Sequence, residues 1–446
     1  MKHHLQAKAD ALLTLGDPVL LAGVQKACLI VDVYGKLHVL ALLEDAEPAT
    51  PKEATMKEAL AVAAEGYWSG ELFLQRGKDH ADGRSKLSDE PLFNAVWDEA
   101  VPEPPSQEKL FVLQRRFSKE SWFDPALQPP WPLHPKTPRI VSFYSYKGGV
   151  GRTTALAAVA LQLARQGERV AVLDFDLEAP GLGSVFPPPS GVPPELGLLD
   201  YFVEYPVLGA GFPLADIFYA YADAKAIGTG EPIQVCWSGQ VAETYLEKLS
   251  RLNLSRLTAA PAQGEAPEIK ALLSFTKKQH MPDWILIDSR AGLHDLGGLA
   301  LSGLAHWHVL CGLDSEQSWA GLRMAVVRLG RTALIAGQCQ KECLLIQAMV
   351  QPGTVGVDSM KRFLSRSHEI FSEEYYVKAE DDPDGKFYEL PDRDATDQPH
   401  FPVTLAHDNQ VMAYQSAADV AERLCEGDFR RLAETLIARV SEALPP

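Results

Sequence analysis

The sequence predicts an α/β domain with a doubly wound, mainly parallel sheet, preceded by a smaller α+β domain. After residue 139, short and fully apolar segments of strand length alternate with segments of helical pattern. This alternation is typical of a parallel sheet that is covered by helices on both faces. Before residue 100 the order of the elements is different, and a proline-rich stretch separates the two regions.

The smaller domain is assigned to residues 1–105. Two apolar runs rich in β-branched residues, 27–33 and 36–43, flank Tyr34-Gly35, which predicts a β-hairpin. Residues 56–65 have a helical pattern, and a short strand is expected to end at Leu74. Residues 109–114 form a further candidate strand, and this region resembles no family that we recognise.

A linker is assigned to residues 106–138. Nine prolines lie between Pro102 and Pro138. Proline lacks an N–H group and restricts the residue before it, so this stretch can form neither a long helix nor a central strand. Its aromatic residues predict that it packs against a domain instead of floating free; they are Trp122, Phe123 and Trp131.

The larger domain is assigned to residues 139–446. Strands are expected at 139–144, 169–174, 284–288, 307–312, 342–349 and 401–405. Helices are expected at 153–166, 316–336, 356–371, 409–425 and 427–443. The last helix carries an apolar stripe with balanced charges on its other face, which favours core packing over membrane docking.

Composition excludes several classes of protein. The 446 residues carry a net charge of −17, which opposes broad non-specific affinity for DNA. The chain starts without the apolar core of a signal peptide, and its apolar runs are too short to cross a membrane, so a cytoplasmic location is expected. The six cysteines are scattered without CxxC pairs, which predicts buried thiols instead of a zinc site.

A phosphate-binding loop is predicted between the first strand and the first helix of the larger domain. Glycines let backbone N–H groups point into a concave nest, and the start of a helix adds positive potential. Thr153 stands where the magnesium-binding hydroxyl belongs. The common GxxxxGK[ST] pattern is altered at two positions, because Tyr146 replaces the first glycine and Arg152 replaces the lysine. Arginine keeps the charge but is larger and forked, so phosphate binding is better supported than hydrolysis.

Two further strands end in carboxylates. Asp174 and Asp176 follow one apolar strand, and alternate residues share a face. Asp288 ends another apolar strand, in the Walker B pattern that binds Mg²⁺ through water. Each strand end is a weak signal by itself. Because the three carboxylates follow a phosphate loop in this order, together they strengthen the prediction of a nucleotide site.

The loop resembles the deviant Walker A motif, KGGxGK[ST], of ParA/MinD-like ATPases, in the variant KGGVGR. Further segments that are similar to this variant are 174–182, 197–202, 288–292 and 314–318. The resemblance covers roughly residues 138–446 and implies a P-loop NTPase fold with ATP and Mg²⁺ as cofactors. The residues that it assigns to the nucleotide are Lys147, Gly148, Gly149, Val150, Gly151, Arg152, Thr153, Thr154 and Gly292.

The resemblance also implies roles for individual residues. Lys147 would reach the phosphates of a partner subunit across an ATP-dependent homodimer, and Lys147, Asp176 and Arg152 form the expected catalytic set. Asp176 would position the attacking water. The metal would be served by Thr153, Asp174 and Asp288. Gly292 would sense the γ-phosphate, and we hypothesise that Arg290 adds positive charge there, the alternative being a surface salt bridge.

The function expected from the sequence is a slow Mg·ATP-hydrolysing switch. The smaller domain would act on an unidentified protein partner, as part of a regulatory or anti-phage system. One alternative is a nucleotide-binding scaffold without hydrolysis, and another is a DNA-segregation ATPase, which the acidic stretch 380–384 disfavours. Iron–sulfur chemistry is set aside because it would need paired cysteines. The aromatic residues at 67, 68, 122 and 131 either dock a partner or fill a core. No residue reads the base, so ATP is preferred over GTP through the resemblance alone.

Overall fold

The computed structural model describes residues 2–44, 49–76, 90–103, 109–123, 129–189, 191–257, 268–336, 343–376 and 390–444. These residues form two compact units, Met1–Phe117 and Ser118–Pro446. Each unit has its own sheet and is described by itself.

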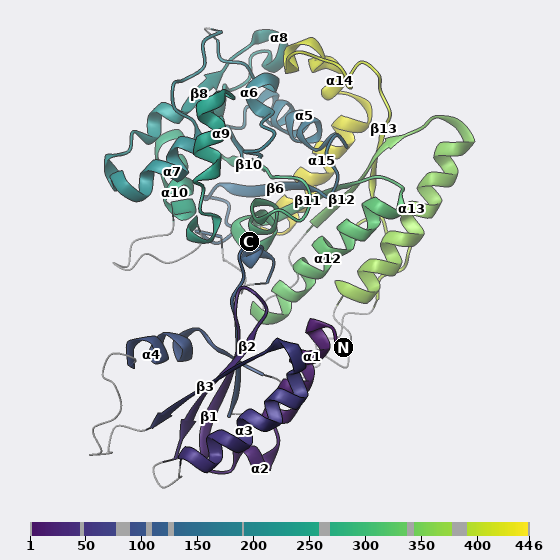
Figure 1. Ribbon diagram of the computed structural model, residues 1–446. Helices are drawn as coiled ribbons and strands as arrows, with labels where there is room; N and C mark the ends of the chain where they lie inside the picture. Colours follow the sequence, from purple (N-terminus) through teal and green to yellow (C-terminus); the bar gives the residue numbers. More distant parts are fainter. Residues whose placement is uncertain are drawn as a thin grey trace. The chain divides into compact units, whose positions relative to one another are not determined.

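The first unit is a five-stranded sheet with the strand order β3-β2-β1-β5-β4 (Figure 1). Its elements are α1 (His4–Leu15), α2 (Pro18–Leu21), β1 (Val24–Val31), β2 (Leu37–Leu43), α3 (Ala49–Ala64), β3 (Trp68–Arg76), α4 (Glu90–Glu99), β4 (Val101–Pro102) and β5 (Leu110–Gln114). The expected hairpin is confirmed, because β1 and β2 pair antiparallel. Helices α1 and α3 share one apolar cluster with the sheet, and α4 packs against a second cluster around Cys28.

Strand β5 belongs to this sheet although its residues fall in the region assigned to the linker. It pairs in parallel with β1 and antiparallel with β4, so it is an interior strand. Val112 and Leu113 are consecutive and both buried, so side chains on both faces of the strand are covered. The first unit therefore extends to Phe117.

The second unit is built on an eight-stranded sheet with the order β13-β12-β11-β6-β10-β7-β9-β8. Its strands are β6 (Arg139–Ser145), β7 (Val170–Asp174), β8 (Phe218–Tyr221), β9 (Ile233–Cys236), β10 (Trp284–Asp288), β11 (Trp307–Gly312), β12 (Cys343–Val350) and β13 (Val403–Ala406). Neighbouring strands are parallel except β8, which runs antiparallel to β9. The predicted doubly wound, mainly parallel α/β fold is thus confirmed.

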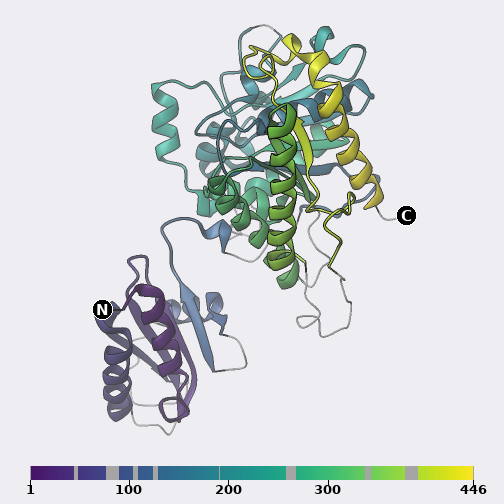
Figure 2. The same cartoon turned by 90° about the vertical axis from the view of Figure 1, so that its right-hand side faces the viewer.

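Helices cover both faces of this sheet. They are α5 (Arg152–Arg165), α6 (Leu182–Val185), α7 (Leu198–Leu208), α8 (Ala224–Ile227), α9 (Glu243–Ser250), α10 (Glu268–His280), α11 (Asp295–Leu299), α12 (Glu316–Ala336), α13 (Gly353–Glu374), α14 (Ala421–Leu424) and α15 (Gly427–Glu442). Helices α12 and α13 lie side by side, in green in Figures 1 and 2. Among the described residues of this unit, further short helical turns lie at 120–122, 209–211, 214–217, 254–257 and 417–419, with a π-helix at 300–304.

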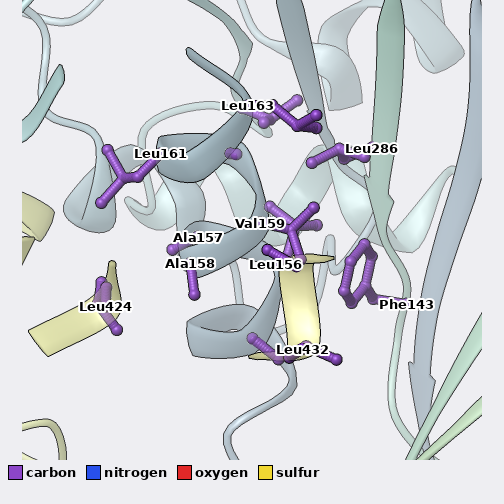
Figure 3. Close-up of a cluster of buried hydrophobic side chains, with 14 of the residues drawn as sticks. Phe143, Leu156, Ala157, Ala158, Val159, Leu161, Leu163, Leu286, Leu424 and Leu432 are labelled. Atoms are coloured by element: carbon purple, nitrogen blue, oxygen red, sulfur yellow. The ribbon is translucent and has the colours of Figure 1, made fainter. Parts of the chain in front are cut away.

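Helix α5 is the centre of the largest core. Nine of its fourteen residues are apolar and buried, and one face lies against Phe143 of β6 and Leu286 of β10 (Figure 3). Leu424 and Leu432 from the end of the chain cover its other side. The apolar stripe of α15 is therefore core, as the sequence predicts. This packing fixes where α5 begins, and hence where the loop before it lies.

The helix expected at 409–425 is wrong. Asp408 accepts a hydrogen bond from the Gln410 backbone N–H, and Asp419 accepts two more, from the backbone N–H groups of Gln415 and Ser416. Such side-chain bonds to the backbone compete with a helical ladder, so only the turns 417–419 and 421–424 are helical. The freed segment 407–412 instead borders the pocket described below.

Several other expectations can be compared with the described residues. Trp122 and Trp131 are buried, and Tyr67 and Trp68 pack against the core of the first unit, so all four contribute to packing. The cysteines other than Cys339, which lies outside the described residues, are buried. The acidic stretch 380–384 also lies outside them. Within the described ranges, no helix has both the length and the apolar character needed to cross a membrane.

Candidate functional site

The loop between β6 and α5 has the backbone of a phosphate nest. Gly149 and Gly151 have φ angles of 71° and 84°, a left-handed conformation that glycine adopts at little cost. A Cβ atom at either position would meet nothing within 4 Å, so backbone conformation and not space explains these two glycines. Gly151 caps α5, whose first N–H groups have no partner within the helix. The loop therefore presents free donors at the positive end of a helix.

Tyr146, which replaces the first glycine of the common motif, is held by a glycine far along the chain. A Cβ atom on Gly321 of α12 would lie 1.8 Å from Cγ of the Tyr146 ring. The ring therefore lies directly on the backbone of α12. The ring of Tyr146 thus occupies the space that the missing side chain of Gly321 leaves on α12.

Arg152 is buried and binds two carboxylates. Its Nε lies 2.5 Å from Oδ1 of Asp288, and a terminal nitrogen lies 2.8 Å from Oδ2 of Asp176. Its side chain is 8% exposed. Burial lowers the pKa of Arg152, but the two carboxylates outweigh burial and raise it, so the guanidinium stays charged. Arg152 is therefore the buried counter-ion of this acidic site.

Thr153, Asp174 and Asp288 converge at the ends of neighbouring elements. Asp174 and Asp288 are register partners on β7 and β10, and the Thr153 hydroxyl donates to Oδ2 of Asp288 at 2.6 Å. Burial raises the pKa of Asp174, and the nearby Asp288 carboxylate raises it further. Burial also raises the pKa of Asp288, although Arg152 opposes this effect. The three predicted metal residues are thus brought together.

The oxygen atoms of Thr153, Asp174 and Asp288 fit a hard cation that takes its remaining ligands from water or phosphate. Hydroxyl and carboxylate oxygens suit Mg²⁺. Among the described residues, no group of three or more His, Cys, Asp or Glu side chains is arranged to hold a metal ion by itself. Mg²⁺ typically takes one or two carboxylates from a protein and completes its shell with phosphate oxygens and water.

Asp176 is enclosed by two arginines. Its Oδ2 faces Arg152, while its Oδ1 accepts from Arg290 at 3.1 Å and from the Ala179 backbone N–H at 3.2 Å. Arg290 also binds Glu178 at 3.0 Å. Arg290 therefore makes the salt bridges of the alternative hypothesis, but one of its partners is the carboxylate expected to orient water.

The loop that carries Gly292 lies against the same sheet edge. Gly292 has a φ of 78°, and its N–H donates to the Ser145 carbonyl at 3.1 Å. The Tyr144 hydroxyl donates to the Gly292 carbonyl, also at 3.1 Å. This glycine is thus tied to both residues that precede the phosphate loop.

Lys147 is half-buried, and its ammonium makes no ion pair within the described parts of the chain.

An open pocket adjoins the loop, and its space, including part of the solvent at its mouth, is about 380 Å³. Val150, Gly151 and Thr154 form the side that belongs to the loop and the start of α5. The remaining wall is mainly apolar and consists of Ala348, Met349, Leu405, Ala406, His407, Asp408, Val411, Met412 and Phe429. Met349 has a φ of 57°, which is strained for a residue with a side chain.

Sequence reasoning did not find this pocket, nor Tyr144 and Gly321. The pocket wall comes from the ends of β12 and β13 and from α15, which no local motif links to the loop. Tyr146 in place of glycine was the only available signal for Gly321, and it does not say which residue must be small.

Residues 136–190 match the ParA family model, described as NUBPL iron-transfer P-loop NTPase. A curated protein, the iron-sulfur cluster carrier protein of Pseudomonas fragi, is 44% identical over 64 residues. That overlap is 14% of this chain, and the chain spans 22% of the relative's length.

Solved structures show a weaker likeness over a longer stretch. The pNOB8 ParA structure bound to nonspecific DNA is 14% identical, covers 68% of this chain and 99% of its own, and has a TM-score of 0.42. MinD of Pyrococcus horikoshii, solved with Mg-ADP, is 18% identical, covers 68% of this chain and 96% of its own, and has a TM-score of 0.40. The family match covers the loop, the strand before it and the helix after it, so this part of the second unit is similar to ParA-family P-loop NTPases.

Proposed function

We propose that the second unit binds Mg·ATP at residues 147–154, dimerises with it and hydrolyses it slowly, as a switch for a protein partner of the first unit. One observation carries the nucleotide-binding part of this proposal. The nest of Gly149 and Gly151 opens α5 at the point where Thr153 donates to Asp288 of β10, which is the register partner of Asp174 on β7. P-loop proteins bind nucleoside triphosphates with the same three parts. Backbone N–H groups bind the phosphates, and a hydroxyl and the carboxylates at strand ends bind Mg²⁺.

Each residue would contribute through position and charge. Loop N–H groups and Arg152 would bind the phosphates, with Thr153, Asp174 and Asp288 on the metal side. Bound Mg²⁺ would supply neutralising charge at the phosphates. Asp176 would hold the attacking water once its oxygens are released from Arg152 and Arg290, and its burial excludes competing solvent.

Lys147 supports the dimer in this proposal. Its half-buried stem stands at the start of the loop, and its ammonium is not neutralised by an acidic residue within the described ranges. A lysine there can reach a second copy that faces the same nucleotide. This role is inferred from the motif that Lys147 shares with ParA/MinD-like proteins.

Phosphate release by wild type and two single variants tests the switch. We expect wild type to release phosphate slowly with Mg·ATP and Asp176→Ala to lose this activity while still binding nucleotide, because only the water-orienting carboxylate is removed. Lys147→Ala should bind ATP but fail to dimerise, as measured by analytical ultracentrifugation with and without ATP. Equal phosphate release by wild type and Asp176→Ala would exclude hydrolysis at this site.

We propose that the nucleobase binds in the pocket beside the loop. It adjoins the loop at Gly151 and Thr154, and its wall is mainly apolar, as is usual for small-molecule sites. A flat aromatic base would pack between side chains such as Met349, Val411 and Phe429.

Filling this pocket separates base binding from phosphate binding. Val411→Trp should weaken ATP binding by about tenfold or more, the equivalent of about 1.4 kcal/mol, while affinity for inorganic tripolyphosphate stays the same. Titration calorimetry with both ligands measures this difference. Val355→Trp is the control, since Val355 is exposed on α13. Equal loss of ATP and tripolyphosphate binding would contradict the base assignment.

A non-hydrolysing scaffold is the second candidate, and the arginine pairs favour it. Both oxygens of Asp176 are engaged by guanidinium groups, and Arg152 stands where other P-loops carry lysine. If nucleotide leaves these pairs intact, the site holds a nucleotide without orienting water. Nucleotide binding without phosphate release, also in the presence of a partner protein, would establish this alternative.

A further inference from the structure

The first residues of the second unit form a short strap on α11, defined as residues 118–123. Trp122 is 9% exposed, and its indole N–H donates to the His294 carbonyl at 2.9 Å. The Ser121 hydroxyl donates to the Asp295 carbonyl at 2.7 Å. Lys119 lies 3.5 Å from the Asp295 carboxylate. The strap therefore binds both the backbone and a side chain at the start of α11.

The contact is close enough to dictate residue choice in α11. A Cβ atom on Gly298 would lie 2.6 Å from the Ser121 hydroxyl oxygen and from two atoms of the Trp122 ring. A π-helix, Ala300–Leu304, follows α11 directly. π-Helical turns are rare and frequent at functional sites. The strap thus lies on a segment whose backbone departs from regular helix.

The strap is joined to the loop that carries Gly292 through one tyrosine. The ring of Trp122 packs edge-on against Tyr144, with centroids 6.0 Å apart, and the Tyr144 hydroxyl binds the Gly292 carbonyl. Gly292 and His294 are also only two residues apart in the chain. Movement at Gly292 therefore reaches Trp122 both through the Tyr144 ring and along the backbone.

On its other side, the strap continues directly into the sheet of the first unit. The Arg115 N–H donates to the Val31 carbonyl of β1 at 2.8 Å, so the ladder of β5 extends to Arg115. Only Arg116 and Phe117 lie between this bond and the strap. The strap and this interior strand are therefore close neighbours along the chain.

We propose that Trp122 is a positioning residue that holds the Gly292 loop, and that the strap carries the nucleotide state of this loop to β5 in the first unit. The proposal rests on the proposed function, because it needs a nucleotide that acts at Gly292. In this proposal the first unit responds to the nucleotide state of the second unit, whatever the identity of its protein partner. The coupling runs through Tyr144, Trp122 and the backbone of residues 116–118.

Hydrogen exchange on the full chain tests this coupling, with and without Mg²⁺ and a non-hydrolysable ATP analogue. In wild type, the analogue should change exchange in residues 290–304, in the strap and in residues 109–117. Trp122→Phe keeps an aromatic ring but removes the N–H donor to His294. It should keep the response at 290–304 and lose the response at 109–117.

Trp131→Phe is the matched control. Trp131 is 8% exposed, and its indole N–H also donates to a backbone carbonyl, that of Pro138, at 2.8 Å. It packs in a different cluster, which does not include Tyr144. This variant should keep all three responses, and thermal unfolding of both variants shows whether their cost to folding is similar.

The outcomes separate the two proposals. An unchanged response at 109–117 in Trp122→Phe, or its equal loss in Trp131→Phe, overturns the coupling and leaves nucleotide binding intact. The same holds if wild type binds the analogue by calorimetry but shows no response in the strap. Absence of analogue binding in wild type overturns the proposed function and the coupling with it.

Discussion

Replacing Arg152 with alanine is expected to lower the free energy of unfolding of the second unit by about 3–5 kcal/mol without nucleotide, the usual result of removing one partner from a buried ion pair. Arg152 is the buried cation between Asp176 and Asp288, whose side chains are 6% and 0% exposed. Without it, two carboxylates remain in a low-dielectric site with one fewer positive charge. Urea titration monitored by hydrogen exchange of β10 measures the change in the second unit alone.

Two variants make this expectation specific. Arg290→Ala also removes a guanidinium from Asp176, but Arg290 is 26% exposed, so its loss should cost about 1 kcal/mol or less. Adding Asp176→Asn to Arg152→Ala should restore part of the lost stability, because one uncompensated charge disappears. A cost for Arg152→Ala no larger than that for Arg290→Ala would contradict the counter-ion role.

Gly321→Ala is expected to disturb the phosphate loop from outside it. The new Cβ would lie 1.8 Å from the Tyr146 ring, so the ring must move, and overpacking of this kind typically costs about 1–3 kcal/mol. Because Tyr146 directly precedes Lys147, nucleotide affinity should fall by about tenfold or more, the equivalent of about 1.4 kcal/mol. Calorimetry with ATP and Mg²⁺ measures this loss.

The same helix offers a matched control. A Cβ on Gly330 would lie 2.1 Å from the Glu374 carbonyl oxygen, so Gly330→Ala also overpacks α12, but away from the loop. It should reduce stability with little effect on nucleotide affinity. Tyr146→Ala in the Gly321→Ala background should recover both properties in part, since the colliding ring is gone. Loss of affinity in both glycine variants alike would mean that Tyr146 is not the cause.

The parts of the fold that the sequence predicted are those with strong local patterns. The strand before the loop, the apolar helix after it and the strands ending at Asp174 and Asp288 each carry a signal within a few residues. Their convergence follows from the sheet, because the carboxyl ends of parallel strands meet at one edge. Strands β8 and β9 have only four residues each, too few for a clear pattern.

The remaining features of the site depend on contacts between distant segments. Tyr146 and Gly321 are complementary only once α12 is packed, and the pairing of Arg152 with Asp176 requires both to be buried together. The prediction of a helix at 409–425 was wrong for a local reason. The helical spacing was outweighed by hydrogen bonds that the carboxylates of Asp408 and Asp419 accept from nearby backbone N–H groups. Pattern alone cannot weigh such competing bonds.

The burial of Trp122 and Trp131 also determines where the second unit can be cut. Both residues precede the first strand of its sheet, yet both belong to its apolar clusters. A chain shortened to begin at Arg139 would retain every strand and the whole phosphate loop but would leave two holes the size of an indole ring. A piece of the second unit that keeps both indole rings in its core therefore has to start at the strap, before the phosphate loop and before residue 136, where the family match begins.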